Sequence, residues 1–132
     1  MKALIFDGKI RIEKNVPIPK RKPFEVLIRV LKAGICQTDL EIIKGYLHFQ
    51  GILGHEFVGI VEESPNQKLL GKRVVGEINL ACGKCRYCQK EMPSHCNVRS
   101  VLGIKDKNGC FAEYITLPIN NIHVIPDSIT DD

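Results

Sequence analysis

The sequence predicts a mainly β fold, a partly closed barrel or a sandwich, on three observations. Short runs rich in β-branched and aromatic residues recur along the chain, and glycine, proline and asparagine separate them at fairly regular intervals. Many short strands with turn residues between them are typical of such architectures. Only one segment is convincing as a helix. With 132 residues, the chain is long enough for one domain to bury a core without disulfides.

The first predicted element is a hairpin near the N-terminus, in KALIFDGKIRIEK. Two β-rich runs flank Asp7-Gly8, a dipeptide that suits the positive φ angles of a type I′ turn. A proline-rich loop follows, and further along the chain the same criteria predict strands over residues 24–34, 57–63, 72–78, 111–117 and 121–126.

The predicted helix begins in TDLEIIKG, after the strand over 24–34. Thr38 is a candidate N-cap, and Glu41 stands three residues later, as in a capping box. Gly45 can end the helix because glycine adopts the left-handed conformation at a C-terminus without strain.

Composition and charge narrow the possible partners. Hydrophobic residues make up 44% of the chain and charged residues 26%, values close to the averages for soluble globular domains. The net charge of +4 is spread along the sequence and does not favour nucleic acid or a membrane as a partner. The apolar run before Asp7 is too short for a signal peptide or a membrane span. We therefore expect a cytoplasmic protein in which stable disulfides are disfavoured.

Four of the six cysteines lie between residues 82 and 96, with the spacing C-x2-C-x2-C-x7-C. Two-residue gaps let a tight turn direct successive sulfurs to one point, and four thiolates at about 2.3 Å complete a tetrahedral zinc shell with no open position. Disulfides and a redox pair are the alternatives, but three cysteines in such close series suit neither. The spacing therefore predicts a structural zinc bound by Cys82, Cys85, Cys88 and Cys96.

A second set of potential metal donors is divided between two segments. Cys36 follows one predicted strand, and His55 and Glu56 precede the next. A thiolate, an imidazole and a carboxylate are all zinc ligands, and a site shared by two segments leaves room for water or substrate. Taken alone, such a cysteine is more often a small buried hydrophobe, and a His-Glu pair is usually at the surface or in a hydrogen bond. Their occurrence together with a zinc-cysteine loop favours a second, reactive zinc site.

Five motifs occur in a characteristic order: GICQTDLE, GHEFVGIVEE, GKRVV, CGKCRYC with a further cysteine at 96, and GCFAEYITLP. In this respect the sequence resembles the N-terminal, GroES-like catalytic domain of zinc-dependent alcohol dehydrogenases, in the medium-chain dehydrogenase/reductase family. The resemblance covers essentially all 132 residues. It implies a GroES-like, partly open β-barrel with few short helices and a zinc-binding loop.

The resemblance also implies roles for individual residues. Cys36 and His55 would bind a catalytic zinc, and Glu56 would be a direct ligand or a neighbour that exchanges with water. Thr38 would pass the proton of the substrate, and Asp39 would hydrogen-bond the ligand histidine. The four-cysteine loop would bind the structural zinc.

The activity implied by the resemblance is the interconversion of a small-molecule alcohol and an aldehyde or ketone. Zinc would activate the substrate oxygen, and hydride would pass to or from NAD or NADP. The intact enzyme would be a homodimer or homotetramer.

Among the departures from the family pattern, two concern potential functional side chains. Many members have a histidine that ends a proton relay where this chain has Glu41, so Glu41 either relays protons or only completes the capping box; we favour the cap. Cys110 stands where glycine is frequent, and we expect it to be a packed thiol and not a ligand.

The sequence contains no G-x-G-x-x-G motif, so we expect no dinucleotide-binding (Rossmann) unit within it. Residues 1–132 are expected to be one catalytic domain of a truncated protein that cannot turn over alone. A stand-alone zinc-binding module without catalysis is the alternative function, but it would not explain the joint presence of Cys36, Thr38, Asp39 and His55. A redox-sensing thiol protein would explain the cysteine count alone.

Overall fold

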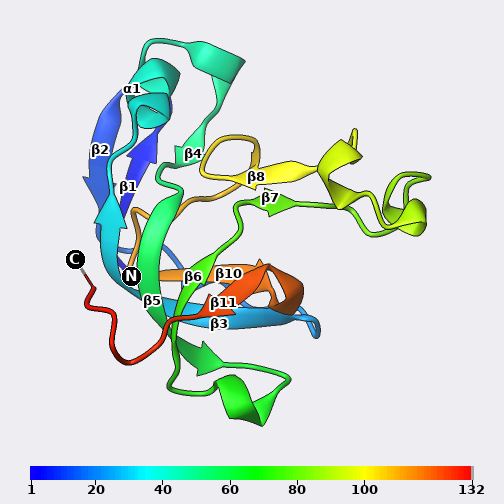
Figure 1. Ribbon diagram of the computed structural model, residues 1–132. Coiled ribbons are helices and arrows are strands. Elements are labelled where there is room, and N and C mark those ends of the chain that lie inside the picture. The colour runs from blue at the N-terminus through cyan, green and yellow to red at the C-terminus, as the bar shows by residue number, and fades with distance from the viewer. Residues whose placement is uncertain (132) are drawn as a thin grey trace.

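Strands dominate the computed structural model, which describes residues 1–131 (Figure 1). They form three sheets. The first has the order β2-β1-β4 and consists of β1 (Ala3–Phe6), β2 (Ile10–Glu13) and β4 (Gly51–Ile52). The central sheet has the order β10-β3-β5-β6-β11 and consists of β3 (Glu25–Gly34), β5 (Glu56–Glu63), β6 (Arg73–Gly76), β10 (Tyr114–Pro118) and β11 (Ile122–Val124). The third has the order β7-β8-β9 and consists of β7 (Asn79–Leu80), β8 (Ser100–Leu102) and β9 (Asp106–Lys107).

The mainly β fold class is confirmed, and the three sheets do not close into one barrel. Besides the strands, the described residues hold one α-helix, α1 (Gln37–Ile43), and five single turns of 3-10 helix. These turns are η1 (Tyr46–His48), η2 (Gln67–Leu69), η3 (Cys88–Lys90), η4 (Pro93–His95) and η5 (Ile119–Asn121). No helix in the described part of the chain has the length and apolar character needed to cross a membrane.

The N-terminal hairpin is confirmed, although its connection differs from the one expected. β1 and β2 are antiparallel, and Phe6 pairs with Ile10. Three residues, 7–9, therefore form the connection instead of the two of a type I′ turn. Gly8 has a φ of 96°, which glycine adopts without steric cost.

The predicted start of the helix is wrong. Cys36, and not Thr38, is the N-cap residue, and Thr38 lies inside the first turn. The capping interaction comes from Asp39, whose Oδ2 accepts a hydrogen bond from the Cys36 amide at 2.9 Å. The expected box with Glu41 does not form, because Glu41 bonds to Gln37 and Lys44 on the helix surface. The predicted end is confirmed, since Gly45 follows the C-cap with a φ of 106°.

The segment over 111–117, predicted as one strand, connects two sheets. Its first residues bond to the N-terminal strand region: the Leu4 amide donates to Phe111 O at 2.8 Å, and the Glu113 amide donates to Lys2 O at 3.1 Å. The strand β10 begins only at Tyr114, where the segment joins β3 of the central sheet. Residues 111–117 thus connect the first sheet to the central sheet.

Two hydrophobic clusters support this arrangement. The larger lies beneath the central sheet and contains Val26, Ile28, Phe57, Val61, Val74, Leu80, Leu102, Cys110, Ile115 and Leu117. The smaller consists of Phe6, Ile42, Phe49 and Leu53, and it joins α1 to the first sheet. Because Leu53 is almost fully buried, this second cluster anchors the loop that leads to His55.

Residues 81–99 form a lobe that extends away from the sheets (Figure 1, yellow-green). It lies between β7 and β8 and contains two turns of 3-10 helix, η3 and η4. Cys96 is its only buried residue. We refer to residues 81–99 as the cysteine lobe.

Candidate metal centres

The ends of two paired strands bring Cys36, His55 and Glu56 together. In the register of β3 and β5, Gly34 lies opposite Glu56, so the residues just beyond the end of β3 face the start of β5. One donor atom from each of the three side chains lies within 4.8 Å of the others. We call Cys36, His55 and Glu56 the mixed cluster.

Asp39 ties the two halves of the mixed cluster together. It is 1% exposed, and besides capping α1 at Cys36 it accepts a hydrogen bond from the Gly54 amide through Oδ1 at 3.2 Å. The same oxygen lies 3.4 Å from Nδ1 of His55. One buried carboxylate therefore contacts the chain on both sides of the cluster.

The environment of His55 fits a metal ligand. Its Nδ1 is buried and makes no hydrogen bond of good geometry, but it faces the carboxylate of Asp39. A carboxylate in this position favours the tautomer with the proton on Nδ1, and this leaves the lone pair of Nε2 for a metal. The chemistry of the donor set, one sulfur, one nitrogen and one oxygen, also suits zinc.

The mixed cluster is open on the side of its carboxylate. His55 is buried and Cys36 half-buried, whereas Glu56 is exposed. Glu56 lies over Gly34, where an added Cβ would come 2.9 Å from Oε2. The missing side chain at position 34 thus leaves the space that Glu56 occupies.

Thr38 lies beside the mixed cluster, and its Oγ1 is 3.7 Å from the sulfur of Cys36. Glu41, one turn further along α1, is engaged elsewhere. Hydrogen bonds from Lys44 and Gln37 lower the pKa of the Glu41 carboxyl. It is therefore an ionised side chain on the helix surface.

The four remaining predicted ligands also converge. Their donor atoms lie within 4.8 Å of one another, and three of the Sγ–Sγ distances are 3.5, 3.9 and 4.0 Å. Four sulfurs placed about 2.3 Å from one ion at tetrahedral angles would be about 3.8 Å apart, so these distances fit a single metal ion. We call Cys82, Cys85, Cys88 and Cys96 the cysteine cluster.

The protonation of the cysteine cluster is uneven. The backbone amide of Cys88 makes the largest contribution to lowering the pKa of Cys85, to about 6. Desolvation, together with the neighbouring thiols, raises the pKa of Cys88 to about 12. Without a cation the cluster therefore holds fewer than four thiolates, and metal binding has to displace the remaining protons.

A family model for the alcohol dehydrogenase GroES-like domain matches residues 22–127. The chain belongs to this family.

Relatives of this GroES-like domain are dehydrogenases. The L-threonine 3-dehydrogenase of Sinorhizobium medicae is 39% identical over 129 residues, which are 90% of this chain and 37% of the relative. The alcohol dehydrogenase from Thermus sp. ATN1 superposes with a TM-score of 0.86 at 32% identity, over 99% of this chain and 42% of that one. A candidate zinc-binding dehydrogenase from Sinorhizobium meliloti bound to NADP gives a TM-score of 0.84 at 34% identity, over 98% and 40% of the two chains. The chain thus spans well under half the length of these relatives.

The structure of this GroES-like domain also shows what sequence reasoning missed around the mixed cluster. Cys110 is buried, as expected of a packed thiol, but its sulfur also donates a hydrogen bond to Glu56 O at 3.4 Å. Burial raises the pKa of this thiol to about 12. The sequence signal was the motif GCFAEYITLP, whose first residues lie directly behind the segment that carries His55.

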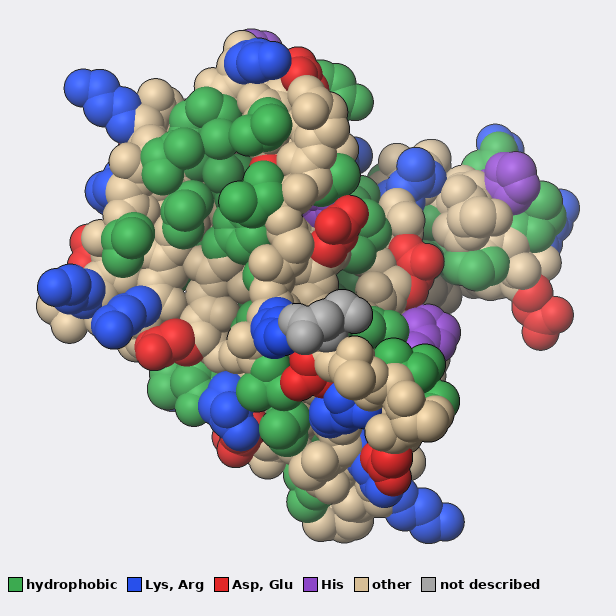
Figure 2. Space-filling model, turned by 60° about the vertical axis from the view of Figure 1, so that its left-hand side comes forward, with side chains coloured by type: hydrophobic (Ala, Val, Ile, Leu, Met, Phe, Trp, Pro, Cys, Tyr) green, Lys and Arg blue, Asp and Glu red, His purple; other side chains and the backbone are tan. Residues whose placement is uncertain are grey.

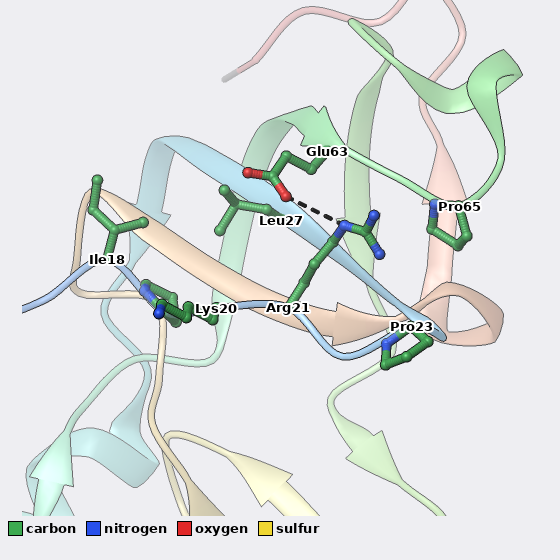
Figure 3. A pocket seen from close by; sticks show the side chains of 8 residues that line it. Ile18, Lys20, Arg21, Pro23, Leu27, Glu63 and Pro65 are labelled. Carbon is green, nitrogen blue, oxygen red and sulfur yellow. Dashed lines mark ion pairs between the residues drawn. The ribbon is translucent and has the colours of Figure 1, made fainter.

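A groove outside both clusters lies between the loop before β3 and the end of β5 (Figure 3). Its volume is about 670 Å³, and Ile18, Leu27 and three prolines form much of its wall. Arg21 and Glu63 pair across it, with 3.3 Å between Nε and Oε2. Because these two charges neutralise each other and neither cluster contributes to the wall, this groove has no part in the metal chemistry.

Proposed function

We propose that this domain binds two zinc ions and supplies the substrate-activating centre of an NAD(P)-dependent oxidoreductase that interconverts an alcohol and a carbonyl compound. The observation that carries the proposal is the mixed cluster, in which Asp39 faces His55 and Thr38 lies beside Cys36. The names of the relatives support it, because they are alcohol and threonine dehydrogenases and include a candidate zinc-binding dehydrogenase bound to NADP.

The two clusters would have different tasks. The cysteine cluster offers four donors, which fill a tetrahedral shell and leave no position for a substrate. The mixed cluster offers three, and its exposed side lies at Glu56. Zinc held there would supply a Lewis acid for the oxygen of an alcohol or carbonyl.

The protein side chains would hold and move the proton. Asp39 keeps the proton of His55 on Nδ1 and so fixes the orientation of the ring. The hydroxyl of the half-buried Thr38 could accept the proton of a substrate alcohol while it donates its own proton to solvent water. Glu41 takes no part in this transfer, since its carboxylate is bonded to Lys44 and Gln37.

The nicotinamide cofactor would be bound by a unit outside residues 1–132. The support is that the sequence contains no G-x-G-x-x-G motif, while the relatives are much longer. Apolar side chains are also exposed on this domain: Ile35, next to Cys36, is 74% exposed, and Figure 2 shows hydrophobic side chains gathered over a wide area of one face. Such patches mark surfaces that pack against another unit.

Two further parts of the proposal rest on the resemblance to the family: the substrate is a small alcohol, aldehyde or ketone, and the intact protein is a homodimer or homotetramer. A third part rests on composition and charge: the protein acts in the cytoplasm without a nucleic-acid or membrane partner.

The experiment that tests this function is the zinc content per chain, measured by elemental mass spectrometry on the purified protein and on Cys36→Ala and Cys85→Ala. We expect two zinc ions in the wild type and the loss of one in each variant. The matched control is His123→Ala, which removes an exposed imidazole outside both clusters and should keep both ions. One zinc that survives Cys36→Ala but not Cys85→Ala would favour a zinc-binding module without a reactive centre, and no zinc in any form would remove the basis of the proposal.

A further inference from the structure

A distant part of the chain holds the segment that carries His55 and Glu56. Three consecutive carbonyls of residues 52–56 each accept a hydrogen bond from residues 108–111, which we call the strap. The bonds run from the Gly109 amide to Ile52 O at 2.7 Å, from the Phe111 amide to Leu53 O at 2.9 Å and from the Cys110 amide to Gly54 O at 2.9 Å.

Side chains of the strap extend this contact at both ends. Asn108 Oδ1 accepts a hydrogen bond from the Ile52 amide at 3.1 Å, and Cys110 Sγ donates to Glu56 O at 3.4 Å. The Gly54 amide is bonded to Asp39 on the opposite side. Because a buried backbone group without a partner is costly, a shift of this segment would break several bonds at once.

The strap can approach this closely only because Gly109 has no side chain. An added Cβ would come 2.6 Å from the carbonyl carbon of Leu53 and still closer to the oxygens of Leu53 and Gly54. At Gly54 a Cβ would meet the ring of Phe111, 2.5 Å from Cδ1. The two segments therefore pack backbone against backbone, with no room between them.

We propose that the strap is the positioning element of the mixed cluster and that Gly109 is the residue on which it depends. It fixes residues 52–56 from behind, so that His55 and Glu56 face Cys36 before any ligand arrives. The consequence for metal binding rests on the proposed function. Loss of outer contacts of this kind lowers the metal affinity of a site by about 10–100-fold.

The test compares Gly109→Ala with Gly59→Ala. The control crowds a backbone carbonyl in a similar way, since its Cβ would lie 2.7 Å from Arg29 O, but it does so within the central sheet and not against the strap. Neither glycine has a positive φ, so steric crowding is the only change in each.

Two readouts are measured on the 132-residue chain. Amide hydrogen exchange of the metal-free protein reports whether Gly54 and Cys110 stay protected, and cobalt titration with visible spectra reports the affinities of the two clusters separately. We expect Gly109→Ala, and not Gly59→Ala, to lose exchange protection at these amides. Gly109→Ala should also bind cobalt about 10–100-fold more weakly at the mixed cluster, while the cobalt affinity of the cysteine cluster stays unchanged.

The proposal would be overturned if the amides of Gly54 and Cys110 were as well protected from exchange in Gly109→Ala as in the wild type. It would also be overturned if Gly59→Ala lost as much protection at these amides as Gly109→Ala. Cobalt binding by the wild type at the cysteine cluster alone would refute the proposed function, while the exchange comparison would still decide whether the strap holds the segment.

If Gly109→Ala does not fold, a second pair of variants tests whether the strap positions the mixed cluster. Asn108→Ala removes the acceptor of the Ile52 amide, whereas Asn108→Asp retains one. We expect faster exchange at Ile52 and weaker cobalt binding in the alanine variant, and recovery of both in the aspartate variant. Identical behaviour of the two would contradict a positioning role.

Discussion

At the scale of single residues, Asp39 performs several tasks. Its two oxygens cap α1 at Cys36, bond the Gly54 amide and face His55. The helix cap and the candidate metal site therefore share one carboxylate, and the start of the helix is coupled to the position of the histidine.

Replacing Asp39 by Asn should weaken the mixed cluster. Asparagine offers one acceptor oxygen in place of two, so at least one of these contacts is lost. We expect the cobalt affinity of the mixed cluster to fall by about 10–100-fold, and the free energy of unfolding by about 1–3 kcal/mol. Cobalt titration and urea denaturation measure the two effects. Asp7→Asn, an exposed carboxylate in the hairpin connection, is the control, and wild-type affinity in Asp39→Asn would show that the carboxylate does not orient the histidine.

The grouping of the potential metal donors was predictable from sequence, but the capping residue was not. Cys36, His55 and Glu56 stand in motifs whose residue types are metal ligands. Thr38 is the better N-cap by side-chain preference, and cysteine is a poor one. The structure places the cap at Cys36 because Asp39, fixed between two segments, bonds its amide, and a tertiary contact of this kind leaves no local pattern.

At the scale of elements, a half-buried lysine joins two sheets. Lys107 of β9 donates to Glu25 of β3 at 3.3 Å and to Thr116 of β10 at 3.0 Å. Burial opposes the charge on Glu25, but the Lys22 amide and the Lys107 ammonium outweigh it and hold the pKa of this carboxyl below its usual value.

The contribution of Glu25 to stability should depend on pH. Because its pKa is lower in the folded state, the stabilisation is complete above the ordinary value of 4.5 and is lost as the pH falls through the folded-state pKa. We expect Glu25→Gln to unfold about 1 kcal/mol more easily at neutral pH, and the difference from wild type to vanish in acid. Urea denaturation across this range measures it, with the exposed Glu62→Gln as control. A difference that persists in acid would mean that packing, and not charge, is responsible.

The cysteine lobe should depend on its metal more than the sheets do. Cys96 is its only buried residue, so little apolar packing holds it together. We expect chelation, or Cys85→Ala, to loosen the backbone of the lobe, so that trypsin cleaves faster after the exposed residues Lys84, Arg86 and Lys90 while β3 and β5 stay protected. Limited proteolysis with mass spectrometry locates the cuts. Unchanged resistance of the lobe in Cys85→Ala would show that packing alone maintains it.

The longer strands were predictable and the shortest were not. The segment over 24–34 carries enough β-branched and other apolar residues to be recognised, and β3 occupies nearly all of it. The strands β4, β7 and β9 have two residues each, too few for any period. They exist because distant partners meet them, as Ile5 meets Ile52.

At the scale of the whole molecule, the fold assembles two groups of side chains that could bind metal ions. The sequence contains no G-x-G-x-x-G motif for binding a dinucleotide. We therefore predict that the 132-residue chain alone does not oxidise alcohols with NAD or NADP. Absorbance of the reduced nicotinamide, followed with zinc-loaded protein and a panel of small alcohols including L-threonine, measures this. Turnover that disappears in Cys36→Ala would refute the prediction.

The overall architecture was predictable because features spread over the whole sequence indicate it. Many short β segments and the motif order together indicated the GroES-like fold, and the family match agrees. The openness of the three sheets and the route of residues 111–113 between two of them depend on long-range pairing, which periodicity cannot show.

The position of the strap has a consequence for biosynthesis. A ribosome delivers the chain from its N-terminus, so the donors of the mixed cluster emerge by residue 56, while the strap that holds them follows only at 108–111. The four cysteines emerge between these points, within fifteen residues of one another, and need no later segment to meet. The cysteine cluster can therefore assemble first on a nascent chain, and the mixed cluster is held in place only when the strap has left the exit tunnel.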